Sequence, residues 1–232
     1  MFYDNFKLLI KAVLKRLRLA GILTKFILRL HNFLYRGIGF LSLCLEPGGI
    51  HPKHRIMNYN DWFTKHIKSN WFVLDIGCDK GALTSDISLA ARKVIGIDIE
   101  EDSIKIARKR YNGNNIEFIC GDITTCIIDF KVDCIVLSNI LEHIKDRGEL
   151  LERLKKVSNR FLIRVPMFNR DWITPYKKEM NIEWRLDKTH CTEYTRESFH
   201  KEMQEAGMEI KEQEIMWGEI YTVVEVENDE IE

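Results

Sequence analysis

Short apolar runs rich in β-branched residues recur between residues 71 and 165, and they constrain the fold more than any other feature of the chain. Segments with helical periodicity lie between several of them. Strands that are apolar on both faces and separated by helices are typical of a parallel sheet covered on both sides. The runs that we expect to form strands are residues 71–76, 93–98, 116–120, 132–138 and 161–165.

The segments around these runs complete an α/β pattern. Two further strand candidates, residues 208–216 and 219–227, would close the sheet with an antiparallel strand. Residues 167–194 form a polar insertion that contains aromatic side chains. Gly207 suits the position that ends a helix. Helices are expected at about 57–67, from about 82, at about 101–111 and at about 196–206.

The net charge of zero conceals an uneven distribution of charge. The chain has 35 basic and 35 acidic residues, yet residues 1–60 contain ten basic residues and only Asp4 and Glu46, a net charge of +8. The rest of the chain therefore carries −8. This division indicates two surfaces with different partners.

The basic segment has the pattern of amphipathic helices. We expect one helix at residues 4–20, a break at Gly21 and a second helix at about 22–36, each with an apolar stripe beside a basic one. The turn-rich residues 46–52 mark a domain boundary. The predicted organisation is a basic helical extension (1–46), an α/β domain (47–227) and an acidic tail (228–232).

Three roles remain open for residues 1–45. They could dock on the α/β domain as a helical cap, lie on an anionic membrane surface, or bind nucleic acid. Two successive basic amphipathic helices with large apolar side chains suit a membrane interface. Nucleic-acid binding is the least favoured role, because the aromatic residues share the apolar face.

Cysteine usage and targeting signals exclude several classes of protein. The six cysteines include no C-x-x-C pair, which indicates reduced thiols rather than a disulfide framework or a zinc site. Basic residues interrupt the apolar N-terminus, so we expect no secretory signal, and no uncharged run approaches the length of a bilayer span. We expect a cytoplasmic protein, which the basic helices could attach to the cytoplasmic face of a membrane.

A glycine loop, residues 77–81 (GCDKG), follows the first expected strand and precedes a helix. Such a loop lets backbone N–H groups and the positive end of a helix approach a ligand closely. Asp75 lies at the end of the first strand, Asp98 ends the second, and Asp122 follows the third. Ligands of open α/β sheets bind at this carboxyl edge, so the three acids would line one site.

Two classes of cofactor compete for the loop. A nicotinamide dinucleotide favours glycines at positions 77, 79 and 82, but the chain has Asp79 and Ala82, and a carboxylate at position 79 suits a pyrophosphate poorly. S-adenosylmethionine carries an ammonium group, a sulfonium and a ribose but no phosphate. The acids therefore favour S-adenosylmethionine.

Residues 71–166 resemble a class I S-adenosylmethionine-dependent methyltransferase of the small-molecule type, similar to the ubiquinone-biosynthesis O-methyltransferase group. The resemblance rests on residues 73–81 (VLDIGCDKG), 94–98 (VIGID), 121–123 (GDI) and 137–144 (LSNILEHI), which match four motifs of the family in order. It implies a Rossmann-like, doubly wound sheet. Position 79, commonly glycine in the family, is aspartate here.

The resemblance also implies which residues bind the cofactor. Gly77 and Gly81 would lie at its methionine moiety, Asp98 at the ribose, and Asp122 with Ile123 at the adenine. Asp75 could instead organise the loop through hydrogen bonds. The complete set that we expect to bind the cofactor is Asp75, Gly77, Gly81, Asp98, Ile99, Asp122, Ile123, Ser138 and Arg55, the last by pairing with the cofactor's carboxylate.

Methyl transfer to a hydroxyl group usually needs a base, and His143 and His190 are the candidate catalytic residues. His143 follows the fourth strand, and His190 lies in the insertion that could cover the substrate. Some related O-methyltransferases bind a divalent cation through Glu-x-x-Glu-His at this place, but here Asn139 replaces the first carboxylate. Losing a charged oxygen ligand weakens a site for a hard cation, so we expect no metal.

The sequence therefore predicts methyl transfer from S-adenosylmethionine, to the oxygen of a small, lipid-associated or glycan-associated acceptor. One alternative is a non-catalytic cofactor-binding scaffold protein, which is consistent with the unusual Asp79. The other, less favoured, is a nicotinamide-dependent oxidoreductase. Nucleic acid is not an expected partner.

Overall fold

The computed structural model describes residues 7–8, 11, 13, 19–46 and 51–227. These residues fall into two compact units. Unit 1 contains the residues up to Ile56 together with Trp172–Trp184, and unit 2 contains Met57–Asp171 and the residues from Arg185 onwards. The 13 residues Trp172–Trp184, which the sequence placed in the α/β domain, thus group with the N-terminal segment.

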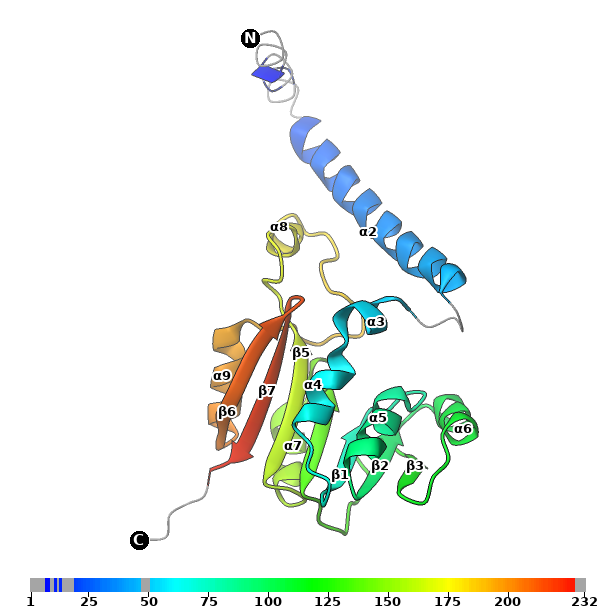
Figure 1. Ribbon diagram of the computed structural model, residues 1–232. Helices are drawn as coiled ribbons and strands as arrows, with labels where there is room; N and C mark the ends of the chain where they lie inside the picture. The colour runs from blue at the N-terminus through cyan, green and yellow to red at the C-terminus, as the bar shows by residue number, and fades with distance from the viewer. Residues whose placement is uncertain (1–6, 9–10, 12, 14–18, 47–50, 228–232) are drawn as a thin grey trace. The chain divides into compact units, whose positions relative to one another are not determined.

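A seven-stranded sheet forms the centre of unit 2 (Figure 1). Its strand order is β3-β2-β1-β4-β5-β7-β6. The first five strands in that order pair in parallel, and β7 pairs antiparallel with both β5 and β6. A mostly parallel sheet with an antiparallel closing strand is therefore confirmed. The strands are β1 (Phe72–Ile76), β2 (Lys93–Asp98), β3 (Ile116–Cys120), β4 (Cys134–Ser138), β5 (Arg160–Pro166), β6 (Met208–Met216) and β7 (Glu219–Val226).

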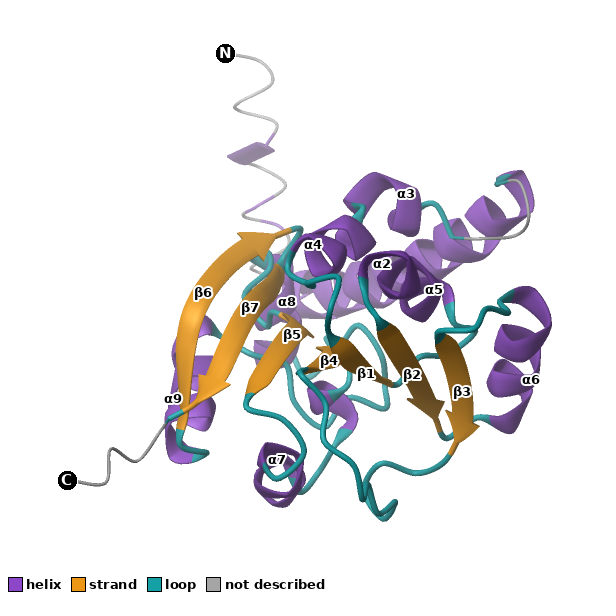
Figure 2. Ribbon diagram, turned by 60° about the horizontal axis from the view of Figure 1, so that its bottom comes forward, coloured by secondary structure: helices purple, strands orange, loops and turns teal. Residues whose placement is uncertain are grey.

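Helices cover both faces of the sheet (Figure 2). Successive side chains of a strand point to opposite faces, so Val73 packs with α4 and α5, while Leu74 packs with α7 and α9. Helix α6 adds a smaller cluster through Ile104 and Ala107 against Phe118 of β3. The helices of unit 2 are α4 (Tyr59–Lys65), α5 (Ala82–Ala90), α6 (Glu101–Arg110), the 3₁₀ turn η2 (Leu141–His143), α7 (Arg147–Lys155) and α9 (Arg196–Glu205).

The expected elements of unit 2 agree with the structure to within about two residues at most ends. The last helix shows why. Thr195 caps α9 by accepting a hydrogen bond from the backbone N–H of Ser198, whose hydroxyl accepts one from the N–H of Thr195. Gly207 follows the helix with a φ of +62°, as a C-cap glycine does. Helix α7 lies in a segment for which we made no separate prediction from the sequence.

Unit 1 contains one long helix, α2 (Leu19–Leu45), and part of the insertion around α8 (Ile173–Glu179). The predicted break at Gly21 is wrong, because the helix continues through Gly21 and past residue 36. A glycine inside a helix costs only about 1 kcal/mol relative to alanine, so Gly21 alone does not end the helix. The side-chain amide of Asn32 donates to the carbonyl of Glu183 at 2.7 Å and joins α2 to the insertion.

Other predictions for the termini cannot be compared with the structure. Most of the expected helix 4–20 lies outside the described residues, as do residues 47–50 of the predicted boundary and the tail 228–232. The short helix α3 (Lys53–Met57) follows residues 47–50. Within the described part of the chain, no helix combines the length and the apolar character that crossing a bilayer requires.

Candidate active site

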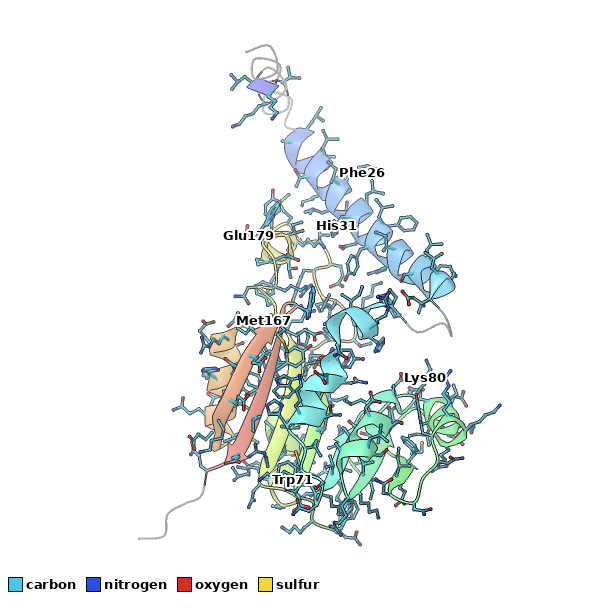
Figure 3. The ribbon with its side chains drawn as sticks, in the orientation of Figure 1. Phe26, His31, Trp71, Lys80, Met167 and Glu179 are labelled. Carbon is cyan, nitrogen blue, oxygen red and sulfur yellow. The ribbon has the colours of Figure 1, made fainter. Side chains whose placement is uncertain are left out.

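The four sequence motifs meet at one edge of the sheet. Figure 3 shows Trp71 near the amino end of β1, and Lys80 and Met167 at the opposite edge, where the parallel strands end. The glycine loop follows β1, and the other motifs follow β2, β3 and β4 at the same edge because these strands are parallel. This is the edge at which an open α/β sheet binds its ligand.

The glycine loop turns through three left-handed residues. Gly77 has a φ of +75°, Asp79 of +45° and Gly81 of +81°. Glycine adopts this conformation without steric cost, and aspartate is one of the few other residues that tolerates it. The carboxylate of Asp79 also accepts a hydrogen bond from the hydroxyl of Ser103 at 2.8 Å. Aspartate at this position is therefore compatible with the turn that the family usually makes with glycine.

The two glycines of the loop lie against neighbouring elements. A Cβ atom on Gly77 would lie 1.8 Å from Cδ1 of Ile140, in the segment after β4. A Cβ atom on Gly81 would lie 2.7 Å from the ring of Phe118 in β3. Both positions need glycine for their backbone conformation and for these close approaches. The contact with Ile140 also shows that the segment after β4 lies directly beside the loop.

Asp98 at the end of β2 holds the loop in place. Its Oδ2 accepts the backbone N–H of Asp79 at 2.7 Å, and its Oδ1 accepts that of Glu100 at 2.9 Å. Each oxygen retains a second lone pair, so the carboxylate can accept from ribose hydroxyls as well. The structure thus gives the residue a structural role alongside the binding role predicted for it.

Asp75 is 1% exposed and accepts a hydrogen bond from the hydroxyl of Thr84 at 2.6 Å. Burial raises the pKa of its carboxyl group to about 7, and the nearby charge of Asp98 acts in the same direction. The hydrogen bond from Thr84 opposes the shift. Through this bond Asp75 joins the end of β1 to α5, which is the organising role that the sequence left open for it.

The buried Asp75 is expected to make the free energy of unfolding depend on pH. Between the unfolded pKa of about 4 and the folded value of about 7, the folded chain binds one more proton than the unfolded chain. The stability contributed by this group is therefore complete below pH ~4 and is lost as the pH rises to ~7.

We expect Asp75→Asn to remove a pH-dependent component of up to about 4 kcal/mol over that interval. Urea unfolding of both proteins at several pH values between about 4.5 and 7.5 measures it. Asp102→Asn, on the exposed face of α6, is the control. Parallel profiles for the wild-type protein and Asp75→Asn would contradict the assignment.

The other predicted cofactor residues occupy different environments. Asp122 forms a turn by accepting hydrogen bonds from the side chain and backbone of Thr124, which lower the pKa of its carboxyl group. Ile123 is buried in the core, Ile99 is 61% exposed, and Ser138 ends β4. Their contacts with the cofactor stay predictions.

Arg55 belongs to unit 1. Its guanidinium donates to the carboxylate of Glu46 at 2.7 Å, which raises the pKa of Arg55. In the structure the arginine is therefore paired within its own unit. The predicted pairing with the cofactor's carboxylate stays a prediction.

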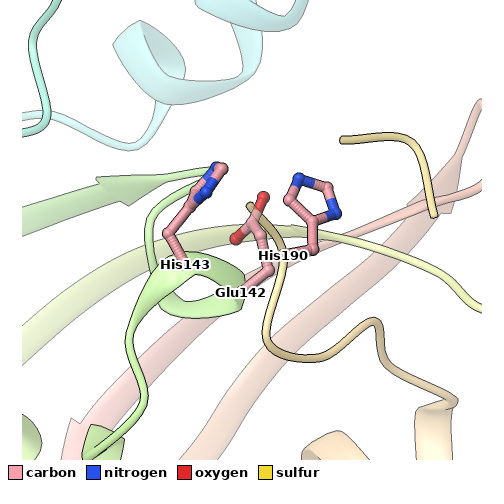
Figure 4. A group of neighbouring side chains, drawn as sticks. All are labelled: Glu142, His143 and His190. Atoms are coloured by element: carbon pink, nitrogen blue, oxygen red, sulfur yellow. The ribbon is translucent and has the colours of Figure 1, made fainter. Parts of the chain in front are cut away.

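The structure brings together the two predicted catalytic histidines. The rings of His143 and His190 lie 4.7 Å apart between centroids and are nearly perpendicular. Glu142, which the sequence analysis did not propose as a site residue, completes the group (Figure 4). One ligand atom from each side chain lies within 4.8 Å of the other two. We refer to these three residues as the Glu142–His143–His190 cluster.

Burial shapes the electrostatics of this cluster. It raises the pKa of the fully buried Glu142 to about 8, although Arg164 acts in the opposite direction. Burial and the neighbouring His190 lower the pKa of His143. Nδ1 of His190 lies 3.0 Å from Oε1 of Glu193, and Nδ1 of His143 lies 2.9 Å from the hydroxyl of Thr189.

A buried ionic network beside the cluster was also missed by sequence reasoning. Nε of Arg164 in β5 lies 3.3 Å from Oε2 of Glu219 and donates to Oδ1 of Asn139 at 3.1 Å. The guanidinium stacks 3.7 Å from the ring centre of Tyr59. A charged residue inside the apolar run of β5 was the available signal, because arginine is almost never fully buried unless it is paired.

Comparison with known proteins identifies the family. A model of the methyltransferase domain family matches residues 52–213. The chain belongs to this family. The alternative of a nicotinamide-dependent oxidoreductase loses its support.

Curated relatives align with part of the chain. It is 29% identical over 131 residues to the ribosomal protein L11 methyltransferase of Neisseria gonorrhoeae, covering 53% of this chain and 43% of the relative. It is 30% identical over 93 residues to the ubiquinone biosynthesis O-methyltransferase of Glaesserella parasuis, covering 37% and 39%. The alignments thus span less than half the length of these relatives.

Solved structures share the fold. The magnesium protoporphyrin IX methyltransferase of Synechocystis, solved with bound S-adenosylhomocysteine, superimposes with a TM-score of 0.59 at 16% identity, covering 75% of this chain and 83% of that one. The complex of DhpI with S-adenosylhomocysteine gives a TM-score of 0.60 at 14% identity, covering 76% and 87%.

The residues of this site fit S-adenosylmethionine, the cofactor that the family indicates. The loop has no side chain at Gly77 and Gly81, and Asp98 presents a carboxylate at the end of β2. A carboxylate accepts hydrogen bonds, so it suits a ligand with cationic groups and ribose hydroxyls. Gly77, Gly81 and Asp98 would hold the cofactor.

Proposed function

We propose that this chain transfers the methyl group of S-adenosylmethionine to an oxygen atom of a small, lipid-associated or glycan-associated acceptor. The observation that carries the proposal is the position of the Glu142–His143–His190 cluster. It follows β4 at the carboxyl edge, and Ile140, two residues before it, packs against Gly77 of the loop. A hydroxyl group placed between the loop and the cluster would meet both the methyl donor and groups able to take its proton.

The reaction is an in-line displacement for which the cofactor supplies an electrophilic methyl group. As the bond between the methyl carbon and sulfur breaks, a bond to the acceptor oxygen forms, and the hydroxyl proton is lost. The protein must align the acceptor and assist removal of the proton. His143 and His190 are the residues proposed to assist it.

Two observations favour an enzyme over a cofactor-binding scaffold protein. Asp79, the residue that suggested a scaffold, adopts the left-handed conformation that the loop requires. The cluster also brings two imidazole rings together at the carboxyl edge of the sheet, which supports a role in removing a proton. A scaffold that only binds the cofactor has no need of these groups.

Methyl-labelled S-adenosylmethionine tests the proposal directly. The full chain would be incubated with it and with fractionated aqueous and lipid metabolites, and labelled products would be identified by mass spectrometry. We expect S-adenosylhomocysteine to form together with a methyl ether or methyl ester. Products methylated only on nitrogen would exclude oxygen as the acceptor atom. Cofactor binding without turnover in any fraction would favour the scaffold.

We also propose that α2 attaches the protein to an anionic membrane surface on the cytoplasmic face. The helix contains Lys25, Arg29 and Arg36 and no acidic residue. Large apolar side chains such as Phe26 (61% exposed, Figure 3) and Phe33 (72% exposed) project from it. Basic residues beside exposed apolar ones are the features of an interfacial helix.

Liposome flotation measures this attachment. We expect the full chain to float with vesicles that contain phosphatidylserine, and Phe26→Ser/Phe33→Ser to reduce the floated fraction severalfold, because each buried aromatic contributes roughly 2 kcal/mol. Ser substitution of the exposed Leu89 on α5 is the control. Equal recovery of all three proteins in the unbound fraction would remove the proposal, and so would equal binding to neutral vesicles.

A further inference from the structure

The carboxyl group of Glu142 is buried without a hydrogen bond. Figure 4 shows it between the rings of His143 and His190. The residue is 0% exposed, and neither of its oxygens has a hydrogen-bond partner among the described residues. Burying a polar group without a partner is unfavourable, which indicates that a ligand completes this site.

The charged residues around Glu142 are already paired with one another. Glu193 pairs with Arg170, and Glu219 pairs with Arg164 at 3.3 Å. Burial and these two carboxylates raise the pKa of Glu142 to about 8, against the opposing effect of Arg164. The pocket therefore lacks one positive charge, and a cation at hydrogen-bond distance would restore the ionised form of Glu142.

Hydrogen bonds fix the tautomer of His190. Its Nδ1 lies 3.0 Å from Oε1 of Glu193, and this carboxylate, which is paired with Arg170, can only accept. Nδ1 therefore donates, and Nε2 of the neutral ring keeps its lone pair. Figure 4 shows the second ring nitrogen of His190 on the side of Glu142. His190 thus offers the cluster an acceptor.

His143 has the same tautomer. The hydroxyl of Thr189 donates its hydrogen to Oδ1 of Asp187 at 2.8 Å, so it accepts from Nδ1 of His143 at 2.9 Å. Nε2 of His143 is again the unprotonated nitrogen. His143 is exposed whereas Glu142 is buried, so a ligand can reach the cluster from the side of His143.

The spacing of the cluster matches hydrogen bonds to an ammonium nitrogen. One nitrogen or oxygen atom from each of the three residues lies within 4.8 Å of the other two. Two acceptors that each lie about 2.9 Å from a tetrahedral nitrogen lie about 4.7 Å apart. A primary ammonium group has three N–H donors and no acceptor. It therefore complements a cluster that offers acceptors and lacks a positive charge.

We propose that Glu142 and His190 bind a primary ammonium group of the methyl acceptor, and that Nε2 of His143 takes the proton of a hydroxyl group on the same molecule. The acceptor is then an amino alcohol, either an amino sugar or the head group of a lipid. The role of His143 rests on the proposed function, whereas the ammonium site does not.

This division of roles explains why oxygen is the atom methylated. An ammonium group held by a carboxylate keeps its proton and has no lone pair, so it cannot attack the methyl group. The hydroxyl oxygen forms the new bond to the methyl carbon as the bond from carbon to sulfur breaks, and its proton passes to His143. Burial and the neighbouring His190 lower the pKa of His143, which keeps its ring neutral and able to accept that proton.

Ethanolamine titration tests the ammonium site without turnover. The full chain, saturated with S-adenosylhomocysteine and kept in EDTA, would be titrated with ethanolamine while the histidine ring signals are followed by NMR. We expect the ring signals of His190 to shift to saturation, and ethylene glycol, which lacks the ammonium, to leave them unchanged.

Variants connect this binding to the cluster. Glu142→Gln, which keeps the side-chain volume, is expected to weaken ethanolamine binding by about 30-fold, the effect of losing a hydrogen bond to a charged group. His190→Gln should weaken it as well. His200→Gln, on α9 outside the cluster, is the control. Binding of S-adenosylhomocysteine confirms that each variant is folded.

Three outcomes of the titration would overturn the proposal. The first is no shift with ethanolamine, or an equal shift with ethylene glycol. The second is ethanolamine binding that Glu142→Gln leaves unchanged. The third is a shift that occurs only without S-adenosylhomocysteine, because the cluster would then bind the ammonium group of the cofactor itself.

The labelled products of the methylation assay identify the source of the acceptor. Each product would be treated with acetic anhydride, which acetylates a free primary amine. Acetylated aqueous products indicate an amino sugar, and acetylated lipid products indicate a lipid head group. Methyl ethers or esters without an amine would overturn this proposal and leave the proposed function intact. Ethanolamine binding without any labelled product would support the ammonium site and count against the proposed function.

Discussion

Replacing Asp98 with alanine is expected to weaken S-adenosylhomocysteine binding by about 100-fold or more, while the domain remains folded. The carboxylate accepts backbone N–H groups from Asp79 and Glu100, and we propose that it also accepts ribose hydroxyls. Hydrogen bonds to a charged group contribute about 1.5–3 kcal/mol each. The loss of the ribose contacts and the loosening of the loop should therefore together lower the affinity for S-adenosylhomocysteine by about two orders of magnitude.

Calorimetric titration with S-adenosylhomocysteine measures the loss, and circular dichroism confirms that the variant is folded. Asp98→Asn should bind with intermediate affinity, since its side chain keeps one acceptor oxygen but donates where the carboxylate accepted. Asp102→Ala is a matched control, because Asp102 is an exposed carboxylate on the adjoining helix α6. If Asp98→Ala bound as tightly as Asp102→Ala, the ribose assignment and the organising role would both be wrong.

The fold was predictable from sequence because its determinants are local. The run at 93–98 is bounded and apolar, and it forms β2 over those same residues. Glycines at 77 and 81 marked a loop that needs left-handed backbone, and both adopt it. Gly207 marked the end of α9, which stops at Glu205. In each case residues within a few positions of one another decide the outcome.

The features that were not predicted from the sequence depend on contacts between distant parts of the chain. His143 and His190 are 47 positions apart, and only folding shows that their rings meet. Glu142 reads as an ordinary polar residue of a turn until its burial is known. The helix through Gly21 was misjudged because one glycine was given more weight than the long helical segment that contains it. No local sequence pattern indicated that Trp172–Trp184 would belong to the same unit as α2.

Removing one partner of the buried pair Arg164–Glu219 is expected to destabilise the domain strongly. The two residues are 5% and 8% exposed, and the hydroxyl of Tyr221 donates to Glu219 at 3.1 Å. Glu219→Ala would leave the guanidinium buried among Tyr59 and Asn139 with its main counter-charge gone. Breaking such a pair costs about 3–5 kcal/mol, which corresponds to a decrease in Tm of roughly 10 °C for a chain of this size.

The same two strands supply a matched control. Arg160 in β5 pairs with Glu225 in β7. The side chains of this pair are more exposed, at 30% for Arg160 and 35% for Glu225. Glu225→Ala should therefore cost no more than about 1 kcal/mol. Thermal and urea unfolding of both variants compare the pairs directly. Equal losses of stability would mean that burial does not set the strength of the Arg164–Glu219 pair.

A double variant distinguishes the net contribution of the buried pair to the free energy of unfolding from the cost of removing only one of its members. Two buried charges lose much of their hydration, and their mutual attraction roughly offsets that loss. Arg164→Met/Glu219→Met removes both charges and keeps apolar volume, so it should be more stable than Glu219→Ala, by about 2 kcal/mol or more. If it proved the least stable of the variants, the pair would itself stabilise the fold. The position of the pair beside Tyr59 and Asn139 would then be explained by stability alone. A stable double variant with impaired turnover would instead indicate that Arg164 organises the segment after β4.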